Sequence, residues 1–340
     1  MPSSPPAFPS SRRAALLGCA LAVAAPGWAK TPGGDIGALL RAADAALAHN
    51  PAPLAVIHVE GTLPTVPAYQ RAMQARQDWN ALAVLAASFA LRRERQYLDG
   101  YGRYLAAWLD VYRISGNPIN ETGMGDWLLA FRAAGADLPT GLAGRMRQFA
   151  ADLATRYTQA QPGNRKTSTN NWQSHRAKLA VMGARAGGDA SLVARAESVF
   201  ARQIADNLLP GGETVDFAER DALHYVVYSL EPLLEAALFS QLSGQSLFQR
   251  AGPQGQCLSR SLAWLAPFAR GEQTHEEFVH STVRFDAQRA AAGVAGFAGP
   301  FLPHAAQRTY WLAARLDAQW QPLSDQLGKP WITQRIGWMV

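Results

Sequence analysis

Two short runs of the chain contain the polar residues whose side chains are best suited to catalysis. The first run includes Asn171 and His175, whose separation of four positions places both side chains on one face of a helix. The second includes Arg220 and Tyr225. Amide, imidazole and guanidinium groups can neutralise a bound carboxylate, and a phenol beside a cation can exchange a proton. If the two runs meet in the folded chain, they supply the groups needed to remove a proton next to a carboxylate.

The first run begins where a helix is expected to start. Asn170 can cap this helix, whose first turn then presents unpaired backbone N–H groups and the positive end of the helix dipole. Such a terminus is suited to holding an anionic ligand. We therefore predict that Asn170, Trp172 and Arg176 bind substrate beside Asn171 and His175. The alternative interpretation is a capping run whose polar surface has no further role.

The second run places several titratable groups on adjoining helical faces. His224 and Tyr228 are four positions apart and flank Tyr225 in the helical pattern. We predict that His224 and Tyr228 contact substrate. A tyrosine on a half-apolar helix is usually a core residue, and it becomes an acid or a base only near a cation that lowers its pKa. Arg220 and His175 are the candidates for that cation.

Both runs resemble known sequence motifs. The run Asn-Asn-Trp-Gln-Ser-His at 170–175 is similar to the Asn-Asn-His active-site motif of the alginate lyase family. The run Arg-Asp-Ala-Leu-His-Tyr-Val-Val-Tyr at 220–228 is similar to the Arg…Ala-Leu-x-Tyr-His-x-Tyr motif of the same family. Segments 117–122 and 275–278 also resemble segments of family members, so the resemblance covers roughly residues 50–300.

The resemblance implies a polysaccharide lyase with an α/α toroid fold, a periplasmic location and β-elimination on a polyuronate such as alginate. It implies that Asn171, His175 and Arg220 neutralise the uronate carboxylate. Tyr225 then takes the C5 proton and protonates the leaving O4 atom when both lie on one side of the sugar. When they lie on opposite sides, His175 can be the base and Tyr225 the acid. This scheme requires no metal or cofactor, and its partner is an anionic polysaccharide.

The sequence departs from the family pattern at three points. Trp172 stands where the pattern has histidine, and the nearest histidine is His175, one helical turn later. Val226 replaces the histidine that follows the motif tyrosine, and the family's arginine position corresponds to Ala218 rather than Arg220. These departures indicate a divergent member and leave the identity of the uronate open.

Two other functions stay open. Glu121, Asp126 and Asp221 include candidates for the carboxylate pair of a glycoside hydrolase, a class of enzyme that also uses α/α toroids. The departures at Trp172 and Val226 are also compatible with a catalytically inactive glycan-binding protein. Convergence of the two polar runs on one groove would favour the lyase over both alternatives.

The elements that must position these residues are predicted to be helices. Apolar residues recur at helical spacing through most of the chain, which predicts an all-α protein. Single helices are expected at 35–49, 79–91, 95–112, 125–135, 142–159, 171–186, 191–207, 218–242 and 259–269. Proline and glycine separate them, and Pro232 predicts a kink or a boundary inside the range 218–242. Sequential helices with short connections pack antiparallel, which favours an α/α toroid over one domain, residues 30–340.

The beginning of the chain is typical of an export signal. Arg12 and Arg13 precede an apolar run at 14–25, which predicts a removable signal peptide over residues 1–29. The two arginines also fit the twin-arginine export route, and Cys19 resembles a lipidation site. The apolar run is too short to span a membrane, and no later segment is long and apolar enough. We therefore expect a periplasmic protein without a membrane span.

The composition narrows the class of partner. The formal net charge is +6, which suits a polyanionic ligand, and we expect a polysaccharide rather than a nucleic acid in that role. After removal of a signal peptide Cys257 would be the remaining cysteine, so no internal disulfide could form. The sequence contains no zinc-type cluster of cysteine and histidine and no calcium loop.

Overall fold

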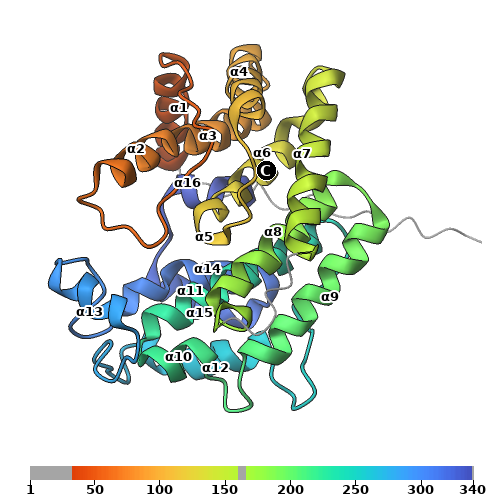
Figure 1. The fold of residues 1–340 in the computed structure, drawn as a ribbon. Helices are drawn as coiled ribbons and strands as arrows, with labels where there is room; N and C mark the ends of the chain where they lie inside the picture. Colours follow the sequence, from red (N-terminus) through yellow and green to blue (C-terminus); the bar gives the residue numbers. More distant parts are fainter. Residues whose placement is uncertain (1–32, 160–165, 339–340) are drawn as a thin grey trace, which may run out of the picture.

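The structure, a computed structural model, describes residues 33–159 and 166–338 (Figure 1). Within these residues, no strand longer than an isolated bridge forms, so the all-α prediction is confirmed. The predicted signal peptide, residues 1–29, lies outside the described residues. The helices are α1 (Gly33–Leu47), α2 (Pro67–Ala75), α3 (Gln77–Arg92), α4 (Arg95–Val111), α5 (Pro118–Glu121), α6 (Met124–Ala134), α7 (Thr140–Gln159), α8 (Asn171–Gly187), α9 (Ala190–Asn207), α10 (Val215–Arg220), α11 (Leu223–Leu242), α12 (Leu258–Ala269), α13 (Arg284–Ala291), α14 (Gln307–Leu316), α15 (Gln321–Leu327) and α16 (Ile332–Arg335).

Short local signals turn the chain between neighbouring helices. α8 is followed by Gly188, whose φ of 83° lies in the left-handed region that glycine adopts without steric cost. The N–H of Gly188 donates to the carbonyl of Ala184 and so caps the end of the helix. The next residue, Asp189, caps α9 through a 2.9 Å hydrogen bond from the backbone N–H of Leu192. The two helices therefore form a hairpin with almost no loop, as Figure 1 shows.

Helix α8 is the centre of the packing. It packs extensively on α7, α9 and α11, and most of its side chains are buried. Buried ion pairs tie it to its neighbours: Lys178 Nζ lies 2.9 Å from Glu235 of α11, and Arg308 of α14 lies 2.5 Å from the same carboxylate. Arg308 also pairs with Glu231 at 3.0 Å. Because each buried charge has an opposite charge beside it, the cluster fixes how these three helices face one another.

An aromatic cluster fills the core of the N-terminal half. The ring centroids of Trp79 (α3), Trp108 (α4) and Trp127 (α6) lie 5.6 to 5.8 Å apart in edge-on pairs. All three side chains are almost completely buried. Trp108 Nε1 donates a 2.8 Å hydrogen bond to Asp78 Oδ2, so its polar atom is satisfied. Edge-on aromatic pairs are the favoured geometry in protein cores, and they hold α3, α4 and α6 together.

The prediction of one helix over 218–242 is wrong. The structure has two helices there, α10 and α11, and the break falls at Asp221, whose φ of 49° is left-handed. Contacts from a distant segment support this break. The backbone N–H of His280 donates to Asp221 Oδ2 at 3.0 Å, and Glu277 accepts from the backbone N–H of His224 at 3.2 Å. Pro232 lies inside α11 and marks no boundary.

Candidate active site

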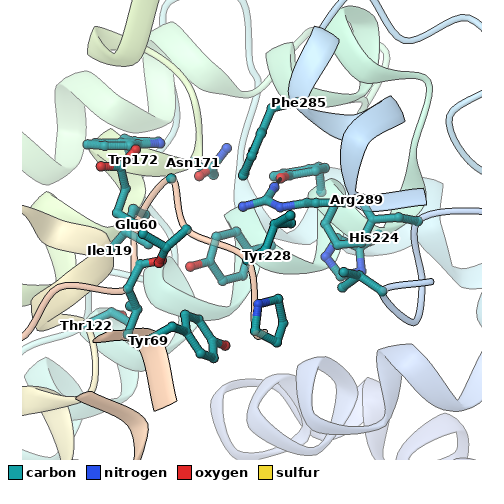
Figure 2. A pocket seen from close by; sticks show the side chains of 18 of the residues that line it. Glu60, Tyr69, Ile119, Thr122, Asn171, Trp172, His224, Tyr228, Phe285 and Arg289 are labelled. Atoms are coloured by element: carbon teal, nitrogen blue, oxygen red, sulfur yellow. Dashed lines mark hydrogen bonds between the residues drawn. The ribbon is translucent and has the colours of Figure 1, made fainter. Parts of the chain in front are cut away.

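A cavity of about 630 Å³ lies where the two polar runs of the sequence meet (Figure 2). Its wall comes from the loop before α2, from Arg76 between α2 and α3, from the segment around α5, and from α8, α10, α11 and α13. The volume falls in the range of roughly 300 to 1,000 Å³ that is typical of small-ligand sites. The wall residues are Val59, Glu60, Gly61, Thr62, Leu63, Pro64, Tyr69, Arg76, Ile119, Thr122, Asn171, Trp172, Arg220, His224, Tyr225, Tyr228, Phe285, Arg289, Val294 and Phe297.

The N-terminus of α8 delivers Asn171 to the cavity. Asn170 Oδ1 accepts a 3.1 Å hydrogen bond from the backbone N–H of Trp172, which confirms the predicted cap. The backbone N–H and the Nδ2 of Asn171 both donate to Asp216 Oδ1, at 2.9 and 2.5 Å. Asp216 is fully buried, and its other oxygen accepts from Asn207 Nδ2 at 2.9 Å. An amide nitrogen carries two hydrogens, so Asn171 is oriented by one and keeps the other for a ligand.

Two arginines surround the phenol of Tyr225. Arg289 Nη1 donates a 2.9 Å hydrogen bond to Tyr225 Oη, and the guanidinium carbon of Arg220 lies 3.9 Å from the centroid of the Tyr225 ring. Burial raises the pKa of Tyr225, while the positive charges of both arginines oppose this rise. The hydroxyl is therefore a protonated phenol at neutral pH, and it already contacts a group that stabilises its ionised form.

The two arginines are themselves held by α13. Arg220 Nη1 lies 2.5 Å from Asp286 Oδ1, and Arg289 Nη1 lies 3.9 Å from the same oxygen. Ser281 Oγ donates to the other oxygen of Asp286 at 2.8 Å, and Asp286 is buried. Arg289 is also packed against the rings of Phe285 and Phe297. One carboxylate therefore orients both cations around the phenol.

His175 lies behind the cavity wall. Its Nδ1 shares a 2.7 Å hydrogen bond with Thr122 Oγ1, and its ring centroid is 4.5 Å from that of Tyr228. Only 3% of His175 is exposed, and its Nε2 is buried without a hydrogen-bond partner. Burial lowers the pKa of His175 well below its usual value, and the charge of Lys178 lowers it further. The imidazole is therefore neutral, and it supports Tyr228 rather than providing a cation beside Tyr225.

His224 and Tyr228 lie on the cavity wall with Tyr225 (Figure 2). Burial lowers the pKa of His224 to about 4, with a further contribution from Arg289, so this imidazole is also neutral. Burial raises the pKa of Tyr228 to about 12. The wall therefore combines neutral polar groups from α11 with positive charge from Arg220 and Arg289.

The structure brings together most of the residues that the sequence nominated. Asn171, Trp172, Arg220, His224, Tyr225 and Tyr228 all line the cavity. Asn170 and Arg176 do not lie on its wall, which corrects their prediction as ligand contacts. Asn170 serves as the helix cap, and Arg176 turns away to donate to the carbonyl of Thr167 at 2.8 Å and to Gln173 at 3.2 Å.

Several wall residues were not predicted from the sequence. Arg289 and Arg76 were not nominated, and the loop containing Glu60 was considered for a cleft wall but assigned no catalytic or binding role. The sequence signal for Arg289 was its helical spacing from Phe285, four positions earlier. This signal was too weak for a prediction, because α13 is short and no motif surrounds it. The loop is fixed by a distant residue, since Asn120 Oδ1 accepts hydrogen bonds from the backbone N–H groups of Val59 and Glu60 at 2.8 and 2.9 Å.

The acids proposed for a hydrolase do not converge on this cavity. Glu121 is fully buried and accepts hydrogen bonds from Tyr112, Tyr157 and the backbone of Ser115, which makes it structural. Asp221 accepts from the backbone of His280 and is absent from the wall. In the described part of the chain, Glu60 is the one carboxylic acid among the wall residues. Hydrolysis by a carboxylate pair therefore has no support from the geometry.

The described ranges 33–159 and 166–338 contain no group of three or more His, Cys, Asp or Glu side chains that could hold a metal ion. In the same ranges, no helix combines the length and the apolar character that crossing a membrane requires.

Comparison with known proteins identifies both sequence and structural similarity. The family model described as Alginate lyase matches residues 26–275. No curated protein matches the chain. Among solved structures, an alginate lyase from Bacteroides ovatus is 13% identical, with a TM-score of 0.65 over 90% of this chain and 92% of that one.

Two further structures belong to alginate lyase A1-III. The enzyme from Sphingomonas species A1 is 16% identical, with a TM-score of 0.54 over 70% of this chain and 78% of that one. A histidine-to-alanine variant of alginate lyase A1-III in complex with a tetrasaccharide is 17% identical, with a TM-score of 0.53 over 73% and 77%. At these identities the likeness shows the fold, and the predicted α/α toroid is confirmed.

Proposed function

This chain belongs to the alginate lyase family, and on that premise we propose that it is a polysaccharide lyase that cleaves a uronate-containing polysaccharide by β-elimination. Alginate is the leading candidate for the substrate. The observation that supports this proposal most strongly is the contact between Arg289 and the hydroxyl of Tyr225, on a cavity wall that also carries Asn171. A phenol held by a cation and a nearby amide donor are the groups that this reaction needs.

The first requirement of the reaction is to neutralise the uronate carboxylate. Removal of the C5 proton places a second negative charge beside that carboxylate, so donors must stabilise the enolate-like intermediate. Asn171 offers its remaining amide hydrogen, and Arg220 and Arg289 offer positive charge on the same cavity wall. Charge-assisted hydrogen bonds in a partly buried cavity are stronger than those in open water.

The second requirement is proton transfer, which we assign to Tyr225. The reaction begins from the small fraction of the phenol that is ionised at neutral pH. Its Oη takes the C5 proton, and the electron pair of the C–H bond moves into the carboxylate to give the enolate-like intermediate. That electron pair then forms the C4–C5 double bond as the C4–O4 bond breaks, and O4 receives the proton from Tyr225 Oη, which returns the residue to its ionised form. One residue can perform both steps when the C5 proton and O4 lie on the same side of the sugar. The position of His175 behind Tyr228 favours this scheme over one with His175 as the base.

The test is formation of the conjugated double bond, followed by ultraviolet absorbance, with a panel of polyuronates that includes alginate. The wild-type chain should generate the absorbance with at least one polymer. Tyr225→Phe should lower the rate by about 10³-fold, because it removes the only atom that exchanges the proton. Tyr97→Phe is the matched control. Tyr97 is a buried tyrosine whose hydroxyl donates a hydrogen bond to Asp44, and it is not a wall residue of the cavity.

Other outcomes point to the alternative functions. New reducing ends without the double bond would indicate hydrolysis. Binding of the polymers without any cleavage would indicate a glycan-binding protein that has lost activity. A rate that is equal in wild type and Tyr225→Phe would contradict the role of Tyr225 while leaving the lyase activity in place.

We also propose that the chain is exported to the periplasm after removal of residues 1–29. The proposal is supported by the sequence pattern of Arg12, Arg13 and the apolar run that follows them. N-terminal sequencing of the protein from a periplasmic fraction tests it. Substitution of both arginines by lysine should block export if the route is the twin-arginine one.

A further inference from the structure

A second cavity adjoins the candidate active site. It has a volume of about 560 Å³, close to that of the first, and it shares the wall residues Pro64, Tyr69 and Arg76 with it. The rest of its wall comes from α2, α3 and the start of α6, and consists of Gln70, Met73, Gln74, Gln77, Trp79, Asn80, Gly123 and Asp126. The cavities are therefore neighbours that meet at the side chains of three residues, one of which is a cation.

Arg76 carries a positive charge that no ion pair neutralises. Within the described residues, no carboxylate oxygen lies within 4.0 Å of its guanidinium nitrogens, and its polar contact is a long one from Nη1 to the sulfur of Met73 at 3.9 Å. Burial lowers the pKa of Arg76, so the site is partly shielded from water. Such a cation gains more from a bound anion than an exposed one does.

The backbone and the core hold Arg76 in place. Arg76 is the junction residue between α2 and α3, and its guanidinium carbon lies 5.1 Å from the centroid of the Trp79 ring. Gly123 lies against the indole and the guanidinium, and its lack of a side chain leaves the space that they occupy. A Cβ added at Gly123 would lie 2.7 Å from the Trp79 ring and 3.0 Å from Arg76 Nη2. The guanidinium therefore rests on a rigid indole and a glycine surface rather than on a flexible loop.

The wall of the second cavity also carries an acid, Asp126, whose charge interacts with that of Arg76. Burial, followed by the nearby charge of Glu235, raises the pKa of Asp126 to about 6, against the opposing charges of Arg308, Lys178 and Arg76. At neutral pH this group is mainly ionised and repels another carboxylate. A uronate in the second cavity would therefore direct its carboxylate toward Arg76 and its hydroxyls toward Asp126 and the amides of Gln77 and Asn80.

We propose that the second cavity binds a uronate unit of the polymer that neighbours the unit being cleaved, and that Arg76 holds its carboxylate. The inference rests on the proposed function and extends it, because it makes the site select for chains with an acidic unit on that side. Arg76 is a specificity-determining residue in this scheme, and the reacting unit occupies the first cavity.

The proposal predicts how the rate depends on chain length. With alginate oligosaccharides of increasing length, kcat/KM of the wild type should rise once the chain is long enough to enter the second cavity. Arg76→Gln should lose that rise, by about tenfold for the long oligomers, because a charge-assisted hydrogen bond is lost. Since Arg76 also borders the first cavity, this tenfold is measured relative to the rate of the same variant with the shortest cleaved oligomer. Arg71→Gln, which removes an exposed arginine from α2, the helix that Arg76 follows, should behave as wild type at every length.

A binding measurement separates this inference from the proposed function. Calorimetry of the Tyr225→Phe variant with an alginate hexamer, with and without Arg76→Gln, reports the contact without requiring turnover. An affinity that falls about tenfold supports the second site even if the wild type forms no double bond with any polymer. Equal affinities, or a loss of kcat/KM by the same factor at every length, would overturn the proposal.

Discussion

At the scale of single residues, opposing effects act on the ionisation of the Tyr225 hydroxyl. Burial favours its neutral form, whereas Arg289 on its hydroxyl and Arg220 over its ring favour its ionised form. Asp286 keeps both arginines in place from one carboxylate. The chemistry of the phenol is therefore set by three charged groups whose own positions depend on α13.

Arg289→Gln tests this control of the phenol. Loss of the positive charge and of its hydrogen bond should raise the pKa of Tyr225 further, so less of the ionised form is available at neutral pH. We expect kcat/KM to fall by about tenfold or more at pH 7 and the deficit to shrink as the pH rises, because alkali restores the ionised form. The measurement is the pH profile of double-bond formation.

The control for this variant is Arg284→Gln, which removes an exposed arginine from the same helix and should leave the profile unchanged. A deficit of the same size at every pH would show that Arg289 acts in some way other than through the ionisation of Tyr225.

The residues that the sequence could identify are those whose roles are local. Asn170 caps α8 through an atom two residues away, so its role follows from the pattern alone. Arg289 lies 64 residues from Tyr225 along the chain, and Asn171 is oriented by Asp216, 45 residues away. No local pattern encodes such pairs, because they form only when the helices pack.

At the scale of helices, the ion pairs between α8, α11 and α14 are the clearest source of rigidity beneath the site. Lys178→Met should lower the free energy of unfolding by about 3 kcal/mol, since it leaves the buried Glu235 with one partner fewer. Urea denaturation measures this change. Arg95→Met breaks an exposed pair with Asp99 on α4 and should cost at most about 0.5 kcal/mol. Equal losses in the two variants would contradict the importance of burial.

The break between α10 and α11 shows why the boundary was missed. The apolar pattern over 218–242 continues in helical phase, and no glycine or proline stands near residue 221, where the break falls. Asp221 adopts its left-handed backbone because His280 and Glu277, more than fifty residues later, satisfy the exposed groups at the break. The hairpin at Gly188, by contrast, has its signals within the turn itself.

At the scale of the whole molecule, the balance of bound protons should make stability depend on pH. Burial raises the pKa of Glu277 to about 8, far above its value in the unfolded chain. Between about pH 8 and 6.5 the folded chain therefore binds a proton that the unfolded chain does not, and lowering the pH should stabilise the fold by up to about 1.4 kcal/mol per pH unit. His224, whose pKa is about 4 in the folded chain, opposes this trend only below its unfolded value near 6.5.

Urea denaturation at several pH values measures this dependence. Glu277→Gln should remove the rise in stability between pH 8 and 6.5, whereas Glu276→Gln, at an exposed neighbouring position, should preserve it. A wild-type stability that is flat across this range would show that the backbone N–H groups of Leu223 and His224, at the start of α11, keep Glu277 ionised.

The class of fold was predictable because it depends on properties repeated along the chain. Helical spacing of apolar residues and short Gly or Pro connections recur from α3 to α9, and each repeat adds the same evidence. The cavity was predictable only in part, since its wall combines the nominated helices with the loop before α2 and with α13. Those two segments have weak patterns of their own and are fixed by contacts with Asn120 and Arg220.

The cluster of Trp79, Trp108 and Trp127 has an optical consequence. Indole rings less than 6 Å apart pass excitation energy among themselves, so the three should emit largely as one chromophore. Trp79 is the member that reaches the second cavity, and Trp172 stands separately on the wall of the first. Although the chain has ten tryptophans, these emitters lie one at each cavity. A bound sugar that carries a quencher should therefore reduce the emission of Trp172 from the first cavity and that of the Trp79 cluster from the second.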